Sequence, residues 1–243
     1  MRKLIVFLVV AGMVIVNSGI ASATSLLLDR GLPTSNLNNA AGASRSNVAW
    51  AFGSDSYGSW LAGDDFKIGG TGNYFVDKIR IWSTSNTGLS VWFGEAGGTI
   101  SQLSSVPLVS ATTYSDNSSY QGSSGSYLPL YQLDISLNMV LSGSATYQFF
   151  LNGLQYAFLH SSNAALSGSS QQGSDNQMLY ALVAPGSDIA TDIGSWDSDG
   201  YGWDKSSDAN IQVFGTPVPE PGTVLLLGLG LVGIAGIRRR FKK

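Results

Sequence analysis

Cysteine is absent from the 243 residues, and histidine occurs once, as His160. The absence of cysteine excludes disulfides, cysteine-ligated zinc and thiol redox chemistry. A Ser-His-Asp triad would have to use His160, and no Gly-x-Ser-x-Gly elbow places a nucleophile for it. Between residues 24 and 216 the one glutamate is Glu95, whereas two-carboxylate glycosidases commonly use glutamate as the proton donor. The sequence therefore predicts that the protein is not an enzyme.

Positive charge is also scarce once both ends of the chain are set aside. Residues 24–216 contain six lysines and arginines against 15 aspartates and glutamates, a formal net charge of −9. A surface of this sign disfavours nucleic acid and anionic membranes as partners, and it suits solubility or divalent cations. We therefore expect no nucleic-acid partner.

The first 23 residues have the layout of a cleaved secretory signal peptide. Two cations precede an apolar run over residues 4–16, and the small residues Ala21 and Ala23 mark the cleavage site. We expect signal peptidase to cut after Ala23, which leaves Thr24 as the first residue. An uncleaved N-terminal membrane span is the alternative, but the apolar run is short for that role.

The C-terminal end, residues 217–243, combines three features in order: a proline-flanked motif, 15 uncharged residues over 223–237, and a basic end. Prolines break regular structure and keep the motif extended. A helix of 15 residues would span about 22 Å, short of a hydrocarbon core of roughly 30 Å, but long cationic side chains beyond it can reach the headgroups. The excess of cations predicts a membrane-spanning helix with a cytoplasmic C-terminus. The motif consists of Val218, Pro219, Glu220 and Pro221, and the basic end contains Arg238, Arg239, Arg240, Lys242 and Lys243.

In this order and position, these residues resemble the PEP-CTERM sorting signal of exopolysaccharide-producing Gram-negative bacteria. The resemblance is confined to the C-terminal tail. It implies that an exosortase, a membrane-embedded transpeptidase-like enzyme, recognises the motif and cleaves near it, after which the protein reaches the cell surface. The alternative is an ordinary tail anchor that is never processed.

Strand patterns dominate residues 24–216, which we take as one secreted domain. Asn152-Gly153 predicts a tight hairpin turn, and no long segment has a helical period. The pattern predicts an all-β domain, an antiparallel β-sandwich of jelly-roll-like connectivity. Strands are expected over residues 75–82, 89–93, 131–137, 145–151, 156–159, 178–183 and 211–214, with weaker candidates over 48–52 and 65–68.

An acidic loop between residues 196 and 204 is the main candidate metal site, whereas Asp64-Asp65 is a weaker acidic spot that is better explained as a strand entry. Asp197, Asp199 and Asp204 offer oxygen ligands for calcium, with glycines that permit tight backbone geometry. The third Asx position and the late acidic ligand of an EF-hand are missing, so a polar loop with Asx turns is the alternative. We therefore expect no obligatory cofactor, with calcium as the one candidate.

Aromatic side chains are the other candidate functional feature, because flat rings can stack on sugars. Trp196 and Trp203, beside the acidic loop, are the favoured carbohydrate contacts. Alternation places Trp82 and Trp92 opposite the aliphatic faces of their strands, so these two are either exposed or covered by loops. The full set of candidates is Trp50, Tyr57, Trp60, Trp82, Trp92, Trp196, Tyr201 and Trp203.

These features together favour a secreted, surface-sorted structural or adhesive protein of an exopolysaccharide matrix or biofilm. The partners expected are signal peptidase and exosortase during processing, the membrane through the C-terminal helix, and extracellular polysaccharide. A carbohydrate-binding module is the second hypothesis, and a polysaccharide hydrolase is the third. The expected route is export, a transient inner-membrane anchor, and then the cell surface or extracellular matrix.

Overall fold

The computed structural model describes residues 24–31, 48–104, 108–113, 120–121, 127–128, 130–162, 178–192 and 208–219. Within these residues the regular structure consists of short strands and one four-residue helix, α2. The elements are β1 Ser25–Asp29, β2 Val48–Asp55, β3 Gly58–Phe66, β4 Asn73–Ser83, β5 Leu89–Glu95, β6 Ile100–Gln102, β7 Leu108–Thr113, β8 Tyr120–Gln121, β9 Tyr127–Leu128, β10 Tyr131–Ser142, β11 Tyr147–Gly153, β12 Ala157–Ser162, β13 Leu179–Val183, α2 Ile189–Asp192, β14 Asp208–Ala209 and β15 Gln212–Pro217.

All strand pairings among the described residues are antiparallel, and 13 strands form one continuous sheet. The main path runs β1-β15-β4-β12-β2-β3-β11-β5-β6, while β10 pairs with β4 and β7, β13 with β3, and β14 with β12. The short strands β8 and β9 pair separately. The prediction of an antiparallel all-β domain is confirmed, and the jelly-roll connectivity stays a prediction.

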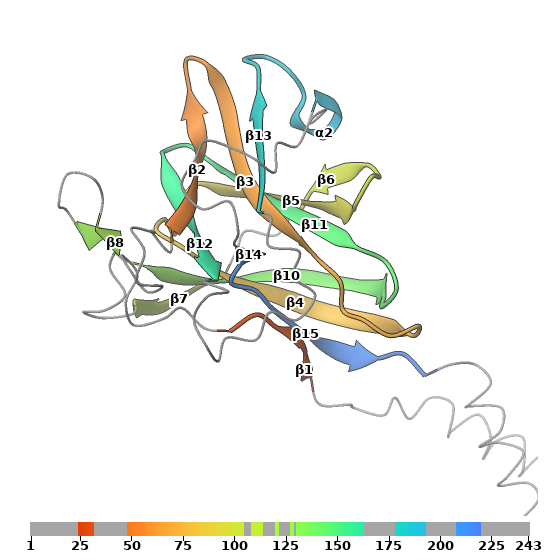
Figure 1. Cartoon of the computed structure of the whole chain (residues 1–243). Helices are drawn as coiled ribbons and strands as arrows, with labels where there is room; N and C mark the ends of the chain where they lie inside the picture. The colour runs from red at the N-terminus through yellow and green to blue at the C-terminus, as the bar shows by residue number, and fades with distance from the viewer. Residues whose placement is uncertain are drawn as a thin grey trace, which may run out of the picture.

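The sheet folds into two layers over one core (Figure 1). Strands β4, β10 and β15 lie in one layer, and β3, β5 and β11 cross over it. Alternate side chains of both layers point between them, as the two-residue period of a strand requires. The main buried cluster draws on both layers and includes Ile79, Ile81, Leu133, Ile135, Phe66, Phe93, Phe149 and Leu151.

The outer faces of the two layers carry smaller apolar clusters. Trp82 is fully buried against Leu130, outside the main core. Trp92 is 9% exposed and packs with Leu61 and Phe150 in a second cluster, against which α2 packs. Of the two outcomes that the strand alternation allowed for these tryptophans, burial under neighbouring segments is the one observed. Neither ring is open to a ligand.

The predicted turn at Asn152-Gly153 is wrong, because both residues belong to β11 and the connection to β12 follows at residues 154–156. The Asn152 side chain explains the difference. Its Nδ2 donates to the carbonyl oxygens of Gly53 at 3.2 Å and Trp60 at 3.0 Å. Asn152 therefore bridges neighbouring strands instead of supporting a turn of its own.

The first and last described strands bring the two ends of the domain together. β1 pairs with β15, and Ser25 lies opposite Gly215, so β1 begins where β15 ends. Directly after β15, the Val218 backbone N–H donates to the Asn73 carbonyl at 2.8 Å. The predicted membrane span over 223–237 lies outside the described residues. Among the described residues, no helix is both long and apolar enough to cross a bilayer.

Candidate functional site

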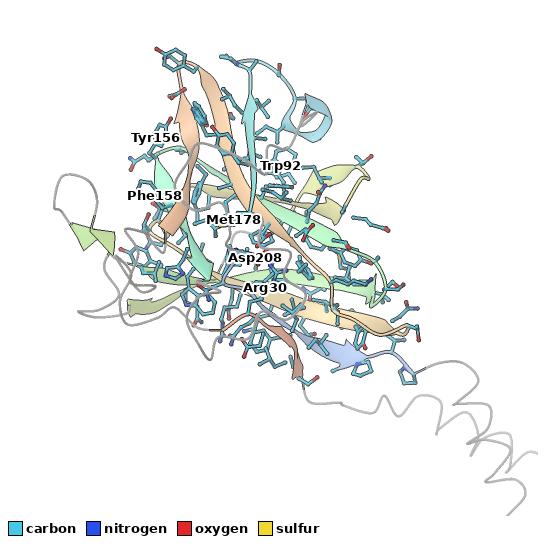
Figure 2. The ribbon with its side chains drawn as sticks, in the orientation of Figure 1. Arg30, Trp92, Tyr156, Phe158, Met178 and Asp208 are labelled. Carbon is cyan, nitrogen blue, oxygen red and sulfur yellow. The ribbon has the colours of Figure 1, made fainter. Side chains whose placement is uncertain are left out.

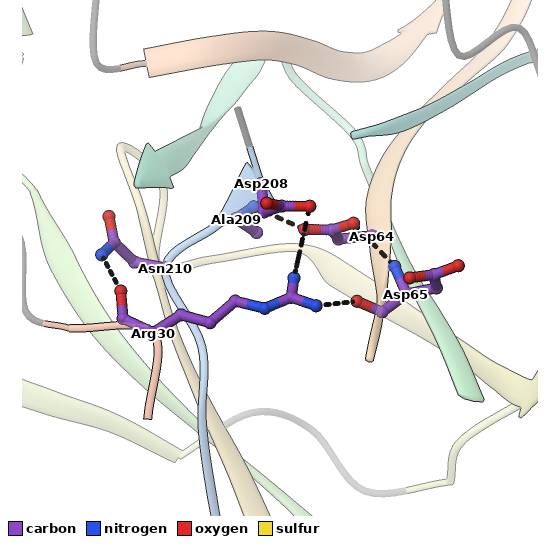
Figure 3. Close-up of polar contacts among 6 residues, drawn as sticks. All are labelled: Arg30, Asp64, Asp65, Asp208, Ala209 and Asn210. Carbon is purple, nitrogen blue, oxygen red and sulfur yellow. Dashed lines mark hydrogen bonds and ion pairs between the residues drawn. The ribbon is translucent and has the colours of Figure 1, made fainter. Parts of the chain in front are cut away.

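Arg30, Asp64 and Asp208 form a buried ion cluster in the middle of the molecule (Figures 2 and 3). Arg30 follows β1, Asp64 lies within β3, and Asp208 begins β14. The Arg30 Nη1 donates to Asp64 Oδ2 at 2.9 Å and lies 3.7 Å from Asp208 Oδ1. The Arg30 Nη2 donates to the Asp65 carbonyl at 2.8 Å. All three charged side chains have 0% exposure, so the cluster joins three distant segments out of reach of solvent.

The electrostatics of this cluster are unbalanced, since two carboxyl groups lie near one guanidinium. Burial raises the pKa of Asp64 well above its usual value of 3.8, Arg30 opposes this rise, and the Asp208 charge adds to it. The backbone N–H groups of Asp65 and Ala209 also donate to the Asp64 carboxylate. A carboxyl with a raised pKa is often a catalytic acid. Here the group is fully buried, and its bonds join the residue after β1 to β3 and β14, so we describe the cluster as a clamp between segments.

His160 lies within β12 and, like the clamp, is buried. Its Nδ1 is 2.6 Å from Asn210 Oδ1, which can only accept, so Nδ1 carries the proton. The Asn210 amide in turn donates to the carbonyls of Arg30 and Gly31, both at 3.2 Å. Burial lowers the pKa of His160 to about 4, although the bond to Asn210 acts in the opposite direction. His160 is therefore neutral and inaccessible at physiological pH, unlike a general base that must reach a substrate.

A second polar constellation lies at the surface, on the β2–β3 turn, and we call it the Asp55 tip. It consists of Asp55, Tyr57, Trp60 and Tyr156. The Asp55 Oδ1 accepts hydrogen bonds from the backbone N–H groups of Tyr57 at 2.7 Å and Gly58 at 3.2 Å. The Asp55 Oδ2 accepts from Trp60 Nε1 at 3.1 Å and from the Tyr156 hydroxyl at 2.8 Å. One carboxylate thus fixes both the turn and the polar edges of two aromatic rings.

The charge of Asp55 is stabilised by these bonds. Desolvation is the largest single effect and raises its pKa, but the hydrogen bonds from Tyr156, Tyr57, Trp60 and Gly58 together outweigh it and leave the pKa below 3.8. Desolvation and the neighbouring carboxylate raise the pKa of the Tyr156 hydroxyl above 10.0. Both groups therefore keep the protonation states that the hydrogen bond requires over the neutral range.

Most of the sequence-predicted site residues lie outside the described residues: Ala21, Ala23, Trp196, Asp197, Asp199, Trp203, Asp204, Glu220, Pro221, Arg238, Arg239, Arg240, Lys242 and Lys243. The calcium and tryptophan sites therefore stay predictions. Val218 and Pro219 are described and follow β15 directly. Within the part of the chain that the structure describes, no group of three acidic or histidine side chains is placed to hold a metal ion.

The sequence had marked Tyr57 and Trp60 as candidate ligand contacts but missed Asp55 and Tyr156. An aspartate that opens a tight turn, as in Asp55-Ser56-Tyr57-Gly58, is a recognisable signal for a side chain that bonds its own turn. The contribution of Tyr156 carries no such signal, because it lies 101 residues from Asp55 in the sequence.

Comparison with known proteins identifies the tail and leaves the body without a match. No curated protein and no solved structure matches the chain. Residues 217–240 match the family model described as the PEP-CTERM protein-sorting motif. The match begins at the last residue of β15 and includes the four motif residues and the three arginines. The chain thus carries a PEP-CTERM sorting signal in its C-terminal tail.

Proposed function

We propose that this protein is exported, processed at its sorting signal, and displayed as a non-enzymatic structural or adhesive component of an extracellular polysaccharide matrix. The observation that carries this proposal is the sorting motif at residues 217–240, which follows the last strand without a gap. Such a motif implies an exosortase as processing partner and a membrane-anchored stage on the route of export.

The boundaries of the folded body support this proposal. Cleavage after Ala23 would leave one residue, Thr24, ahead of β1, and cleavage near Glu220 would spare all of β15. Of the motif residues that the structure describes, Val218 bonds the body through its backbone N–H, which donates to the Asn73 carbonyl. Both targeting segments can therefore be removed while all the described strands keep their partners.

The absence of an enzymatic role is part of the proposal, and the described polar groups support it. His160 and the Arg30 clamp are buried, and Asn210 links them. The Asn210 side chain bonds the His160 ring and donates to the Arg30 carbonyl. The body carries a net charge of −9, which suits a soluble component of a hydrated matrix. A display role needs a folded body and a route to the surface, and the strand-built body and the sorting motif support these two requirements.

The orientation follows from the charges of the tail. The body is on the periplasmic side while the basic residues 238–243 remain in the cytoplasm. The anchored form is transient, and the released body reaches the cell surface or the matrix. Replacing the three arginines with glutamate is expected to disturb orientation and retention, which protease protection of the tagged C-terminus would reveal.

Glu220→Ala tests the sorting itself. The variant is expected to insert normally and to accumulate at full anchored size, because the motif would no longer be recognised. The measurement is the ratio of precursor to mature protein on immunoblots of cell fractions. Glu95→Ala is the matched control, since Glu95 is exposed on the body and is the only other glutamate. If Glu220→Ala is processed and surface-exposed like the control, the tail is an anchor only and the proposal fails.

A further inference from the structure

We propose that the Asp55 tip binds a neutral polysaccharide, with the rings of Tyr57, Trp60 and Tyr156 stacking on sugar faces. The biological setting of this site rests on the export proposed above, whereas its binding chemistry does not. Its carboxylate bonds the polar edges of the exposed Tyr156 ring and the half-buried Trp60 ring, and it fixes the backbone of the exposed Tyr57.

Exposed apolar side chains gather at this tip. Of the eight large apolar side chains exposed on the described residues, two belong to the tip: Tyr57 at 74% exposure and Tyr156 at 53%. A third, Leu182 of β13 at 46%, lies opposite Trp60 in the neighbouring strand. Exposed apolar groups gathered in this way mark interaction sites on soluble proteins.

The backbone around the rings is fixed before any ligand arrives. Gly53 has a φ of 153°, and a Cβ there would lie 3.0 Å from Gln155 O and from the Tyr156 Cα. Only a glycine thus lets the β11–β12 connection approach β2 closely enough for Tyr156 to reach Asp55. The Asn152 amide, bonded to the carbonyls of Gly53 and Trp60, holds the same approach from the other side. Rings that are already positioned lose little entropy on binding.

The charges near the tip select an uncharged ligand. No lysine or arginine occurs in β2, β3, β13 or residues 153–157, so an anionic polysaccharide would meet no cation there. The four hydrogen bonds to Asp55 occupy its two oxygens, so it positions the rings and does not contact the sugar itself. Ser54, Ser56 and Gln155 are exposed beside the rings and can exchange hydrogen bonds with sugar hydroxyls.

The position of the tip favours an extracellular ligand over the lipid surface. β3 begins at the tip, and its nine residues extend about 30 Å toward the opposite end of the molecule. That opposite end contains the start of β4, where Asn73 receives the hydrogen bond from Val218. Figure 1 shows the β2–β3 hairpin and the end of β15 at opposite extremes of the molecule. The tip thus points away from the segment that is anchored in the membrane.

The test is retention of the purified full-length chain, in detergent, on insoluble curdlan, microcrystalline cellulose and chitin. Wild-type protein is expected to be retained on at least one of these neutral polymers and less on carboxymethyl cellulose, their anionic counterpart. Tyr57→Ala and Tyr156→Ala are each expected to weaken retention about tenfold, the loss typical of an aromatic contact at the centre of a site. Tyr156→Phe keeps the ring but loses the bond to Asp55, and it is expected to fall between wild type and Tyr156→Ala.

Phe75→Ala is the matched control, because Phe75 is an aromatic residue of 38% exposure at the anchored end. It is expected to bind like wild type. Tyr57 is too exposed for its loss to unfold the body, so an unchanged thermal transition in Tyr57→Ala separates binding from folding.

The proposal is overturned if wild type is retained on none of the neutral polymers, if carboxymethyl cellulose is preferred, or if Tyr57→Ala and Phe75→Ala behave alike. A dimer that Tyr57→Ala dissociates would identify a second copy as the occupant and would also overturn it. Processing of the Glu220 variant has no bearing on these outcomes, so the two proposals fail separately.

Discussion

Arg30 is the residue on which the charge balance of the interior depends. Its guanidinium pairs with the carboxylates of Asp64 and Asp208, and all three side chains are fully buried. A buried ion pair adds little net stability over an apolar replacement, because desolvation offsets the attraction. Removing only the cation is different, because it takes from the buried Asp64 the charge that favours its ionised form.

Arg30→Met is therefore expected to lower the free energy of unfolding by about 3–5 kcal/mol at pH 7. The loss should be smaller at pH 5. A carboxyl whose pKa is raised in the folded state, as for Asp64, favours folding at low pH, and this contribution is lost as pH rises from 3.8 through the folded-state pKa. Without Arg30 the pKa of Asp64 rises further, so the deficit grows with pH. Urea unfolding at the two pH values measures it.

Lys78→Met is the matched control for that experiment. The Lys78 side chain is 30% exposed, and its partner Asp134 keeps two hydrogen bonds from Arg80, at 2.6 and 3.0 Å. The expected loss is below about 1 kcal/mol, because the pair is only partly buried and Arg80 continues to neutralise Asp134, with little difference between pH 5 and pH 7. An Arg30→Met deficit that is as small as the control, or that does not change with pH, would contradict the view of Arg30 as the counter-charge.

At the scale of single residues, the sequence shows which side chains carry charge or a polar group, but it does not show which residues they bond. Nothing in the local pattern around Asp64 points to its partner, yet Asp64 lies inside β3 and bonds an arginine 34 residues away. His160 likewise lies within β12 and has an asparagine 50 residues away as its partner. Contacts of this range depend on the layer arrangement, and no local pattern encodes them.

At the scale of secondary structure, strand alternation predicted β4 and β10, where one face of the strand meets the core, and missed most of β3, where both faces are covered. β4 and β10 show clear apolar alternation and were predicted. The sequence predicts β3 only from residue 65 onward. Within β3, the adjacent residues Leu61 and Ala62 belong to two different buried clusters, so both faces of the strand are apolar there. A strand buried on both faces shows no period of two, and glycine and aspartate within it weaken the signal further.

Gly63 is what allows β3 and β11 to pair so closely. A Cβ at Gly63 would lie 1.9 Å from the Phe149 carbonyl oxygen and 2.4 Å from the Phe150 ring. Gly63→Ala is therefore expected to cost about 3 kcal/mol or more, because a backbone atom cannot move aside cheaply. Thermal unfolding followed by near-UV circular dichroism measures the loss. Gly72→Ala, with no heavy atom within 4 Å of its Cβ, should be neutral or slightly stabilising. Equal transitions in the two variants would show that the pairing tolerates the extra atom.

At the scale of the whole molecule, the sheet is completed by its last strand. β15 lies between β1 and β4, so these two strands gain their shared partner only when residues 212–217 are in place. The Arg30 clamp adds a second dependence, because Asp208 lies close to the same end of the chain. The body can thus finish folding only after its C-terminal strand has been exported, which places folding and presentation of the sorting motif close together in time.

The short distance between the folded body and the membrane anchor predicts a limit on processing. Five residues, 218–222, separate the end of β15 from the predicted span, and they extend over at most about 17 Å. Roughly 6 Å of this length crosses the headgroup layer. A folded body held so close to the bilayer hinders a membrane-embedded enzyme that must reach Glu220, and the bond from Val218 to Asn73 keeps the start of the motif on the body.

Inserting ten glycine and serine residues between Pro217 and Val218 is therefore expected to speed conversion of precursor to mature protein severalfold. The new segment frees Val218 from Asn73 and moves the body away from the membrane, while the motif and its distance from the span stay unchanged. Pulse-chase labelling gives the conversion rate. The same ten residues inserted at Gly97, in the exposed β5–β6 turn, leave the tail spacing intact and should not alter the rate. If the precursors of both insertion variants are converted to mature protein at the wild-type rate, the folded body does not hinder the enzyme. The enzyme then reaches its motif before the body folds, and β15 joins the sheet only after cleavage.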